Sequence, residues 1–206
     1  MWDVRYAEAE LAYGDAPNDF LAAQAGRLPG SGRALALAEG QGRNAVWLAT
    51  RGLEVTAVDQ SAVGLARAEA LAATRGVALH TLVADLAHHD LGTGCWDVIV
   101  SIWAHMPPAV RRPLHRAVVA ALRPGGLFVL EAYTPAQVGR GTGGPPDPSL
   151  CMTLAGLREE LAGLEVLHGV ERERQVHEGR YHQGPSAVVK VLARAPGGVS
   201  DLTGPG

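Results

Sequence analysis

The sequence has little cysteine, little lysine, few aromatic side chains and no long apolar run. Its two cysteines, Cys95 and Cys151, lie far apart and form no C-x-x-C pair, so a disulfide framework is excluded and a reducing, cytoplasmic setting is expected. Lys190 is the only lysine, which leaves it as the one side chain able to form a Schiff base. No apolar run approaches the ~18 residues of a membrane-spanning helix, and no signal sequence is recognised. These absences predict a soluble protein.

The charge pattern argues against nucleic acid as a partner. The formal net charge is −3, and the positive residues are scattered along the chain instead of being gathered into a basic stripe. No electrostatic footprint for nucleic acid is therefore predicted. The length of 206 residues suits one domain, and a domain of that size buries roughly 70% of the surface that its unfolded chain exposes. The expected partner is a small molecule.

Apolar runs alternate with helical patterns from residue 33 onward, which predicts a parallel sheet covered by helices. We expect strands near 33–38, 54–58, 78–83, 96–102 and 126–132, and helices over 43–51, 61–75 and 107–122. Two further strand patterns, near 165–175 and 186–193, predict a terminal antiparallel hairpin. The expected fold is α/β, a single-domain Rossmann-like sheet that is mostly parallel, ends in this hairpin and carries helices on both faces.

The domain is expected to span residues 1–195. Its first part, 1–30, combines an aromatic-rich arm with a short helix and is a candidate lid over a ligand. A segment rich in glycine and proline, 139–148, follows the fifth strand, where a loop of the site is expected. The tail, 196–206, has little to bury and should be loose.

The most informative segment runs from an apolar strand into two close glycines and then into a helix. Gly40 and Gly42 lack the Cβ atoms that would hold a ligand away from the backbone, and free N–H groups at the helix start face the same space. The next strand pattern ends at Asp59, 19 positions after Gly40. That spacing is close to the ~20 residues expected for an acid that holds ribose hydroxyls. The segment therefore predicts a nucleotide site.

Two kinds of nucleotide fit this turn. Gly40-x-Gly42-x-x-Ala45 satisfies the dinucleotide fingerprint, which would make the protein an NAD-dependent oxidoreductase. Single-domain enzymes of that kind usually carry Tyr-x-x-x-Lys, and the chain has no such motif. Three other features favour a different nucleotide: the turn 124–126 before a strand, an acid after the third strand, and the closing hairpin.

With these motifs in order, the chain over 30–194 resembles class I S-adenosylmethionine-dependent methyltransferases. It is most similar to the small tellurite-resistance-like enzymes, and its opening also resembles thiopurine and thiol methyltransferases. The motifs that carry the resemblance are Trp2-Asp3-Val4-Arg5-Tyr6, Tyr13-Gly14-Asp15-Ala16-Pro17-Asn18, Gly40-Gln41-Gly42-Arg43-Asn44 and Val58-Asp59-Gln60-Ser61.

The resemblance implies S-adenosylmethionine as cofactor and S-adenosylhomocysteine as product. It assigns the ribose hydroxyls to Asp59, the adenine edge to Asp85 or the N–H of Leu86, and the methionine portion to the end of the fourth strand. The cofactor residues expected on this basis are Ala38, Glu39, Gly40, Gly42, Arg43, Asn44, Asp59, Gln60, Ser61, Asp85, Leu86, Ser101 and Ile102.

The chain departs from its relatives at the first strand. Many of them carry an Asp where Ala36 stands, and Ala38 replaces the first motif glycine. The methionyl ammonium is therefore assigned either to Glu39, the nearest acid, or to backbone carbonyls. A purely structural role is the alternative for Glu39, since an acid at a helix N-terminus is favoured by the helix dipole.

The acceptor is expected to be a small molecule, and the resemblance favours a thiol or a selenium or tellurium oxyanion. His105, at the carboxyl edge of the sheet, is the leading catalytic candidate, with packing against the next helix as its alternative role. The other acceptor candidates are Tyr6, Trp103, Arg140, His177 and His182. No metal site is expected, because adjacent histidines such as His88 and His89 do not converge on one ion. A non-catalytic S-adenosylmethionine-binding protein remains the second alternative.

Overall fold

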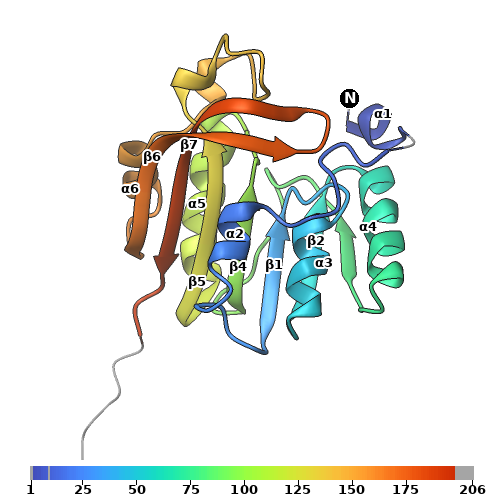
Figure 1. Cartoon of the computed structure of the whole chain (residues 1–206). Coiled ribbons are helices and arrows are strands. Elements are labelled where there is room, and N and C mark those ends of the chain that lie inside the picture. The colour runs from blue at the N-terminus through green and yellow to red at the C-terminus, as the bar shows by residue number, and fades with distance from the viewer. Residues whose placement is uncertain (1, 9, 198–206) are drawn as a thin grey trace, which may run out of the picture.

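A seven-stranded sheet in the order β3-β2-β1-β4-β5-β7-β6 forms the centre of the computed structural model, which describes residues 2–8 and 10–197 (Figure 1). The strands are β1 (Arg33–Leu37), β2 (Glu54–Asp59), β3 (His80–Val83), β4 (Trp96–Ile102), β5 (Leu122–Tyr133), β6 (Glu165–Glu178) and β7 (His182–Arg194). Neighbouring strands from β3 to β5 are parallel, whereas β7 is antiparallel to both β5 and β6. The expected Rossmann-like α/β sheet with a closing antiparallel hairpin is confirmed.

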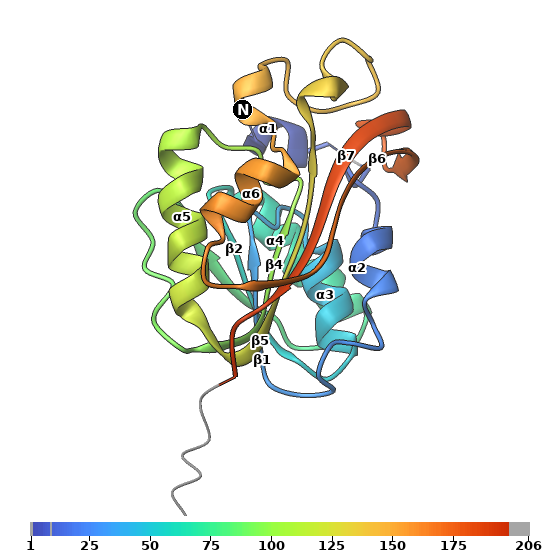
Figure 2. The ribbon, with the colours of Figure 1, turned by 90° about the vertical axis from the view of Figure 1, so that its left-hand side faces the viewer.

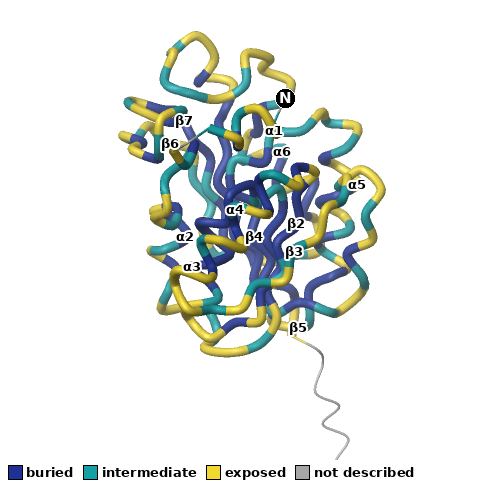
Figure 3. Tube along the Cα trace, turned by 90° about the vertical axis from the view of Figure 1, so that its right-hand side faces the viewer, coloured by how far each residue is buried: buried dark blue, intermediate teal, exposed yellow. Residues whose placement is uncertain are grey.

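Helices cover both faces of this sheet (Figure 2). The helices are α1 (Trp2–Tyr6), α2 (Asp19–Ala23), α3 (Arg43–Thr50), α4 (Ala62–Thr74), α5 (Pro108–Ala121) and α6 (Leu154–Glu160), with short 3₁₀ turns at Pro135–Gln137 and Pro148–Leu150. Alternation along β1 explains the two layers: Ala34 packs with α2 and α3 on one face, and Leu35 packs with α5 and α6 on the other. The central strands are accordingly buried along most of their length (Figure 3).

The closing hairpin differs from the expected one in length. β6 and β7 pair from Glu165↔Arg194 to Glu178↔His182, so the turn is confined to Gly179–Tyr181. Sequence patterns place a polar turn over 177–184, because charged and polar side chains dominate there. Within the part of the chain described, the carboxylate of Glu178 and the imidazole of His182 are instead buried, at 4% and 6% exposure.

Two other boundaries are shifted. β5 begins at Leu122, before the Pro-Gly-Gly turn that is expected to precede it, and the register breaks between Trp96 and Val98 to accommodate the extra residues. The expected loose tail lies almost wholly outside the described residues, which end at residue 197. No helix among the described residues is long and apolar enough to cross a membrane.

Candidate active site

The turn after β1 has the backbone conformation that its glycines allow. Gly40 and Gly42 have φ values of +61° and +89°, and Ala38 also lies in the left-handed region at +51°. The space beside these glycines is filled by protein: a Cβ on Gly40 would lie 2.5 Å from the Tyr6 hydroxyl, and one on Gly42 would lie 2.4 Å from Cβ of Ala68. The expectation that both glycines make room for a ligand is therefore wrong in its detail. They admit Tyr6 of α1 and helix α4.

Asp59, at the end of β2, links the glycine turn after β1 to the turn after β2 through hydrogen bonds. Its Oδ2 accepts the N–H of Gly40 and its Oδ1 accepts the N–H of Ser61, both at 2.8 Å. Burial raises the pKa of the carboxyl, and these backbone N–H groups oppose that rise. Each oxygen keeps a lone pair for a further donor, since an ionised carboxylate has about four acceptor positions.

Glu39 closes the N-terminus of α3. Its Oε1 accepts the N–H groups of Asn44 and Ala45, both at 2.8 Å, so two of the unpaired donors of the helix are satisfied by one carboxylate. Burial raises the pKa of Glu39 to about 7. The capping role considered for this acid is present, and the side chain also faces the pocket.

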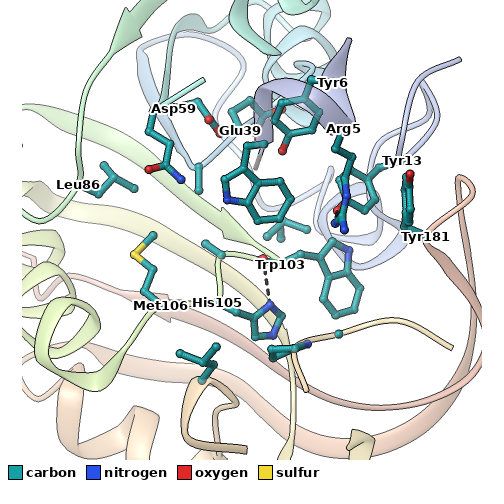
Figure 4. A pocket seen from close by; sticks show the side chains of 18 of the residues that line it. Arg5, Tyr6, Tyr13, Glu39, Asp59, Leu86, Trp103, His105, Met106 and Tyr181 are labelled. Carbon is teal, nitrogen blue, oxygen red and sulfur yellow. Dashed lines mark hydrogen bonds between the residues drawn. The ribbon is translucent and has the colours of Figure 1, made fainter. Parts of the chain in front are cut away.

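A pocket of about 640 Å³ lies at the carboxyl edge of the sheet, between the N-terminal arm, the ends of β1 to β4, the glycine- and proline-rich loop and the hairpin. Of the expected site residues, its lining includes Tyr6, Ala38, Glu39, Arg43, Asn44, Asp59, Gln60, Asp85, Leu86, Ile102, Trp103, His105 and His182. Figure 4 shows Asp59 and Leu86 on one side of it and Arg5, Tyr13 and Tyr181 on the other, with Trp103 and His105 between.

The remaining expected residues do not line this pocket. The backbone of Gly40 and Gly42 and the N-cap of α4, Ser61, lie behind it, and Ser101 is buried in β4. Two acceptor candidates lie elsewhere on the surface: Arg140 pairs with Glu173 at 2.5 Å, and His177 is exposed beside Gln183. Arg140 lies in the glycine- and proline-rich loop and is held by Glu173 of β6, whereas His177 still belongs to β6, which extends farther than expected.

Trp103 forms the floor between the two ends of the pocket and has a constrained backbone. Its φ of +59° is unusual for a bulky residue. The ring stacks on Tyr133 at a centroid distance of 4.4 Å and meets His182 edge-on at 5.0 Å. Its indole N–H donates to Oε2 of Glu178 at 2.6 Å. Contacts on three sides therefore hold the strained residue in one orientation.

Glu178 is the centre of a buried charge network that joins distant parts of the chain. In addition to Trp103, the carboxylate accepts from Asn18 at 2.9 Å, Arg43 at 2.5 Å and Arg174 at 2.7 Å. These donors hold the pKa of Glu178 near 2 against the opposing effect of burial, with the Arg43 charge the largest of the lowering influences. The network ties the N-terminal segment, α3 and the hairpin to the floor of the pocket.

Both ring nitrogens of His105 are used by the backbone. Nδ1 lies 3.0 Å from the carbonyl oxygen of Trp103, and Nε2 accepts the N–H of Tyr133 at 2.9 Å. This arrangement needs a neutral imidazole that donates from Nδ1. Burial lowers the pKa of His105 to about 4. The geometry therefore gives His105 a structural task at the pocket wall and leaves no free nitrogen for proton transfer.

The N-terminal arm is fastened over the pocket by side chains from the nucleotide turn. Gln41 accepts the N–H of Ala12 at 2.7 Å and donates to the carbonyl of Tyr6, while Ser61 donates to Asp3 at 2.5 Å. Figure 1 shows α1 beside the tip of the β6–β7 hairpin and above α4. The arm is thus tied to the turns after β1 and β2 at the edge of the pocket.

Several lining residues are missing from the expected set. Arg5 and Tyr13 stand in the motifs that carry the family resemblance but are not among the expected site residues, Tyr181 lies in the turn of the hairpin, and Gly143 and Gly144 bring in the glycine- and proline-rich loop. The unusual concentration of the few aromatic residues is a signal that could have found them. The chain has ten Phe, Tyr and Trp side chains, and five of them line this pocket: Trp2, Tyr6, Tyr13, Trp103 and Tyr181.

Comparison with known families gives a direct match for the central part of the chain. Residues 34–126 match a family model described as a methyltransferase domain. This segment contains the glycine turn, Asp59, Asp85, Trp103 and His105. The match favours the methyltransferase interpretation over the NAD-dependent oxidoreductase. No curated protein matches the chain.

Solved structures share the fold over most of the chain. One, from a study of the conversion of a disulfide bond into a thioacetal group during echinomycin biosynthesis, has a TM-score of 0.71 and 23% identity, covering 93% of this chain and 87% of its own. TehB from Haemophilus influenzae has a TM-score of 0.70 and 20% identity, covering 86% of this chain and 61% of its own. An S-adenosylmethionine-dependent methyltransferase from Mesorhizobium loti has 0.64 and 23%, covering 84% and 96%.

Proposed function

We propose that this chain, a class I S-adenosylmethionine-dependent methyltransferase, methylates a small molecule at a soft atom, a thiol sulfur or a selenium or tellurium centre. The observation that carries the proposal is the continuity of the pocket. One cavity of about 640 Å³ runs from Glu39 and Asp59 to His105 and the loop at Gly143, so cofactor and acceptor share it. A protein that only sensed the cofactor would not need the second half.

The residues at the ends of β1 to β3 suit the cofactor chemically. Asp59 offers free carboxylate lone pairs to ribose hydroxyls, and Leu86 offers an apolar surface and a backbone N–H to adenine. Glu39 keeps one carboxylate oxygen free of any hydrogen bond in the described chain and faces the pocket, so it suits an ammonium group. We assign the cofactor to these residues, with Ile102 beside its methionine portion.

A bound S-adenosylmethionine supplies an activated sulfonium methyl group. What remains for the chain is to align the acceptor, exclude water and leave the attacking lone pair free. The aromatic floor and the fastened arm serve the first two needs. His105 acts as a positioning residue, because it joins Trp103 to Tyr133 through its two hydrogen bonds.

Among the described residues that line the acceptor half, neither histidine is a suitable general base, and this favours a soft nucleophile. His105 has no free nitrogen, and burial lowers the pKa of His182 to about 3. An alcohol or a protonated amine would need a proton acceptor with a pKa nearer neutrality. A thiol with a pKa of ~8.5 ionises to a useful extent by itself, and an oxyanion needs no deprotonation. The sulfur chemistry named for one structural neighbour points in the same direction.

The setting that we propose follows from the same features. The chain acts as one domain over 1–195, with the arm over 1–30 as its lid. The formal charge of −3 favours a small-molecule acceptor over nucleic acid. Two unpaired cysteines, Cys95 and Cys151, fit a reducing cytoplasm.

A transfer assay tests this function. Purified protein is incubated with S-adenosylmethionine and, separately, an alkyl thiol, selenite, tellurite, a primary alcohol and a primary amine, and S-adenosylhomocysteine is quantified. We expect turnover with at least one of the first three and none with the alcohol or amine. Turnover with the amine or alcohol alone would contradict the soft-nucleophile proposal. Asp59→Asn serves as the impaired control, and Arg158→Gln, an exposed change on α6, as the unimpaired one.

A further inference from the structure

The acceptor half of the pocket contains one cation without a counter-ion. Arg5 of α1 lines the pocket, and the face of its guanidinium packs on Trp2 at 5.1 Å and on Tyr181 at 4.3 Å from the ring centroids. Its Nη1 donates to the Tyr13 hydroxyl at 2.9 Å. Among the described residues no carboxylate lies within ion-pair distance of it. Because a guanidinium has five N–H donors, most of its edge is unused.

The acids of the pocket lie at its other end. Glu39, Asp59 and Asp85 follow β1, β2 and β3, where the cofactor is assigned. The second cation of the lining, Arg43, is already paired with Glu178 at 2.5 Å. The half that faces the acceptor thus has an unbalanced positive charge at Arg5.

Two buried polar atoms, one in His182 and one in the neighbouring Tyr133, also have no partner among the described residues. The Nδ1 atom of His182 and the hydroxyl of Tyr133 make no hydrogen bond, although both residues are more than nine-tenths buried. The His182 ring lies 4.7 Å from Tyr13 and 5.3 Å from Tyr133, so these groups form one cluster with Arg5. An unpartnered buried polar group is costly unless a ligand or water satisfies it.

We propose that Arg5, Tyr13 and His182 form a subsite for an anionic group of the acceptor, a carboxylate or an oxyanion. This inference rests on the proposed function, because it assumes that an acceptor occupies this half of the pocket. The planar fork of Arg5 suits a bidentate anion, and the Tyr13 hydroxyl, which accepts from Arg5, keeps its own proton to donate. Aromatic rings around the cluster suit a flat or apolar body behind the anion.

His182 stays uncharged in the free protein. Burial is the largest cause and lowers its pKa to about 3; Glu178 opposes this effect, and the positive charges of Arg43 and Arg5 add to it. The side chains that face this imidazole from the arm, the floor and β5 are Tyr13, Trp103 and Tyr133. A neutral His182 can donate a hydrogen bond to an anion held by Arg5.

A binding experiment tests the subsite without requiring turnover. The protein saturated with S-adenosylhomocysteine is titrated by calorimetry with 3-phenylpropionate and with its neutral isostere, 3-phenylpropionamide. A hydrogen-bonded ion pair contributes about 1.5–3 kcal/mol, so we expect the carboxylate to bind roughly ten- to a hundredfold more tightly than the amide. Equal affinities, or tighter binding of the amide, would overturn the proposal.

Variants test whether the preference for the carboxylate over the amide depends on Arg5 and His182. Arg5→Gln should reduce the ratio of the two affinities to about one, and Arg5→Lys should keep part of it, because a lysine retains the charge but not the fork. His182→Gln gives a second variant of the same cluster and should lower the ratio if Arg5→Gln does not fold. Arg158→Gln should leave it unchanged. A preference for the carboxylate that survives in both Arg5→Gln and His182→Gln would contradict the assignment.

The methionyl carboxylate of the cofactor is the other source of an anion, and a second titration separates it from the acceptor. S-Adenosylhomocysteine carries this carboxylate, whereas 5′-methylthioadenosine lacks it. We expect Arg5→Gln to change both affinities by the same factor, less than about threefold. Selective loss of S-adenosylhomocysteine binding would place the cofactor's carboxylate on Arg5 and overturn the acceptor subsite. Since neither titration depends on methyl transfer, an incorrect acceptor chemistry and an incorrect subsite give different results.

Discussion

The two ends of the pocket are built in different ways. The cofactor end comes from short segments that are close in sequence: Glu39 follows β1 and Asp59 ends β2, and each accepts backbone N–H groups of the turn or helix start beside it. The acceptor end gathers Arg5, Trp103 and His182 from the arm, β4 and the hairpin. Local hydrogen bonds hold the first end, whereas the buried network around Glu178 holds the second. The cofactor end therefore depends on short local motifs, whereas the acceptor end forms only when the whole chain has folded.

The largest effect should come from breaking the network that assembles the acceptor end. Glu178→Gln removes a buried charge and leaves Arg43 and Arg174 without their shared counter-ion. Breaking a buried pair in this way destabilises a protein by about 3–5 kcal/mol. The measurement is the free energy of unfolding in urea.

An exposed ion pair of the same hairpin supplies the control. Glu165 pairs with Arg194 at 2.7 Å, and both side chains are about half exposed. Glu165→Gln should therefore change the stability by no more than about 1 kcal/mol. If both variants unfold at the same urea concentration, the network does not hold the hairpin in place.

At the cofactor end the expected change is in binding. Asp59→Asn removes the charge and one acceptor from a carboxylate that we assign to the ribose hydroxyls. Losing hydrogen bonds to a charged group should weaken S-adenosylhomocysteine binding by about 1–3 kcal/mol. Calorimetric titration measures this, with the unfolding free energy recorded in parallel because Asp59 also holds Gly40 and Ser61. Unchanged affinity in a folded variant would remove the assignment.

His105 tests whether the acceptor end works by positioning. His105→Ala removes both hydrogen bonds that connect Trp103 and Tyr133, and displacement of the floor should lower kcat about 10- to 100-fold with cofactor affinity retained. His88→Ala, an exposed change on a loop outside the pocket, is the control.

The pH profile of the unaltered enzyme separates positioning from base catalysis. Burial lowers the pKa of His105 to about 4, so its ring is neutral throughout the range from pH 5.5 to 8.5. Over that range we expect kcat to vary with pH in the same way in the unaltered protein and in His105→Ala. A change in kcat near pH 6.5 that is absent from His105→Ala would identify His105 as the proton acceptor.

The smallest expected effect is a pH dependence at Glu39. Burial raises its pKa to about 7, so the carboxyl is protonated below that value in the free protein and charged above it. An ammonium group binds the charged form. Affinity for S-adenosylhomocysteine should therefore rise with pH between 6 and 8, by up to about tenfold for one linked proton. Glu39→Gln should remove this dependence of the affinity on pH. An unaltered slope in that variant would show that Glu39 does not bind the ammonium group and would assign it to backbone carbonyls.

This contrast also explains what the sequence could predict. The strands from β1 to β4, the turn at Gly40 and the acid Asp59 follow from periodicity and spacing within the segment from Arg33 to Ile102, and those features are confirmed in position. The placement of His177 depended on where the hairpin turns, and that of Arg140 on its ion pair with Glu173. The buried ends of β6 and β7 look polar in sequence because Glu178 and His182 are paired or packed only after folding.

The glycines show the same limit at short range. Sequence spacing correctly marked Gly40 and Gly42 as positions where a Cβ atom would not fit. It could not reveal that Tyr6 and Ala68 occupy the space beside them, because both neighbours come from other helices. Arg5 stayed unassigned for a similar reason: only the folded chain shows that its charge has no partner.

The most direct measurement is a parallel calorimetric titration of the purified protein with S-adenosylmethionine, S-adenosylhomocysteine and NAD. We expect micromolar binding of the first two and none of NAD, with Asp59→Asn weakening both. Binding of NAD alone, or affinities that Asp59→Asn leaves untouched, would contradict the assignment of the cofactor to the ends of β1 to β3.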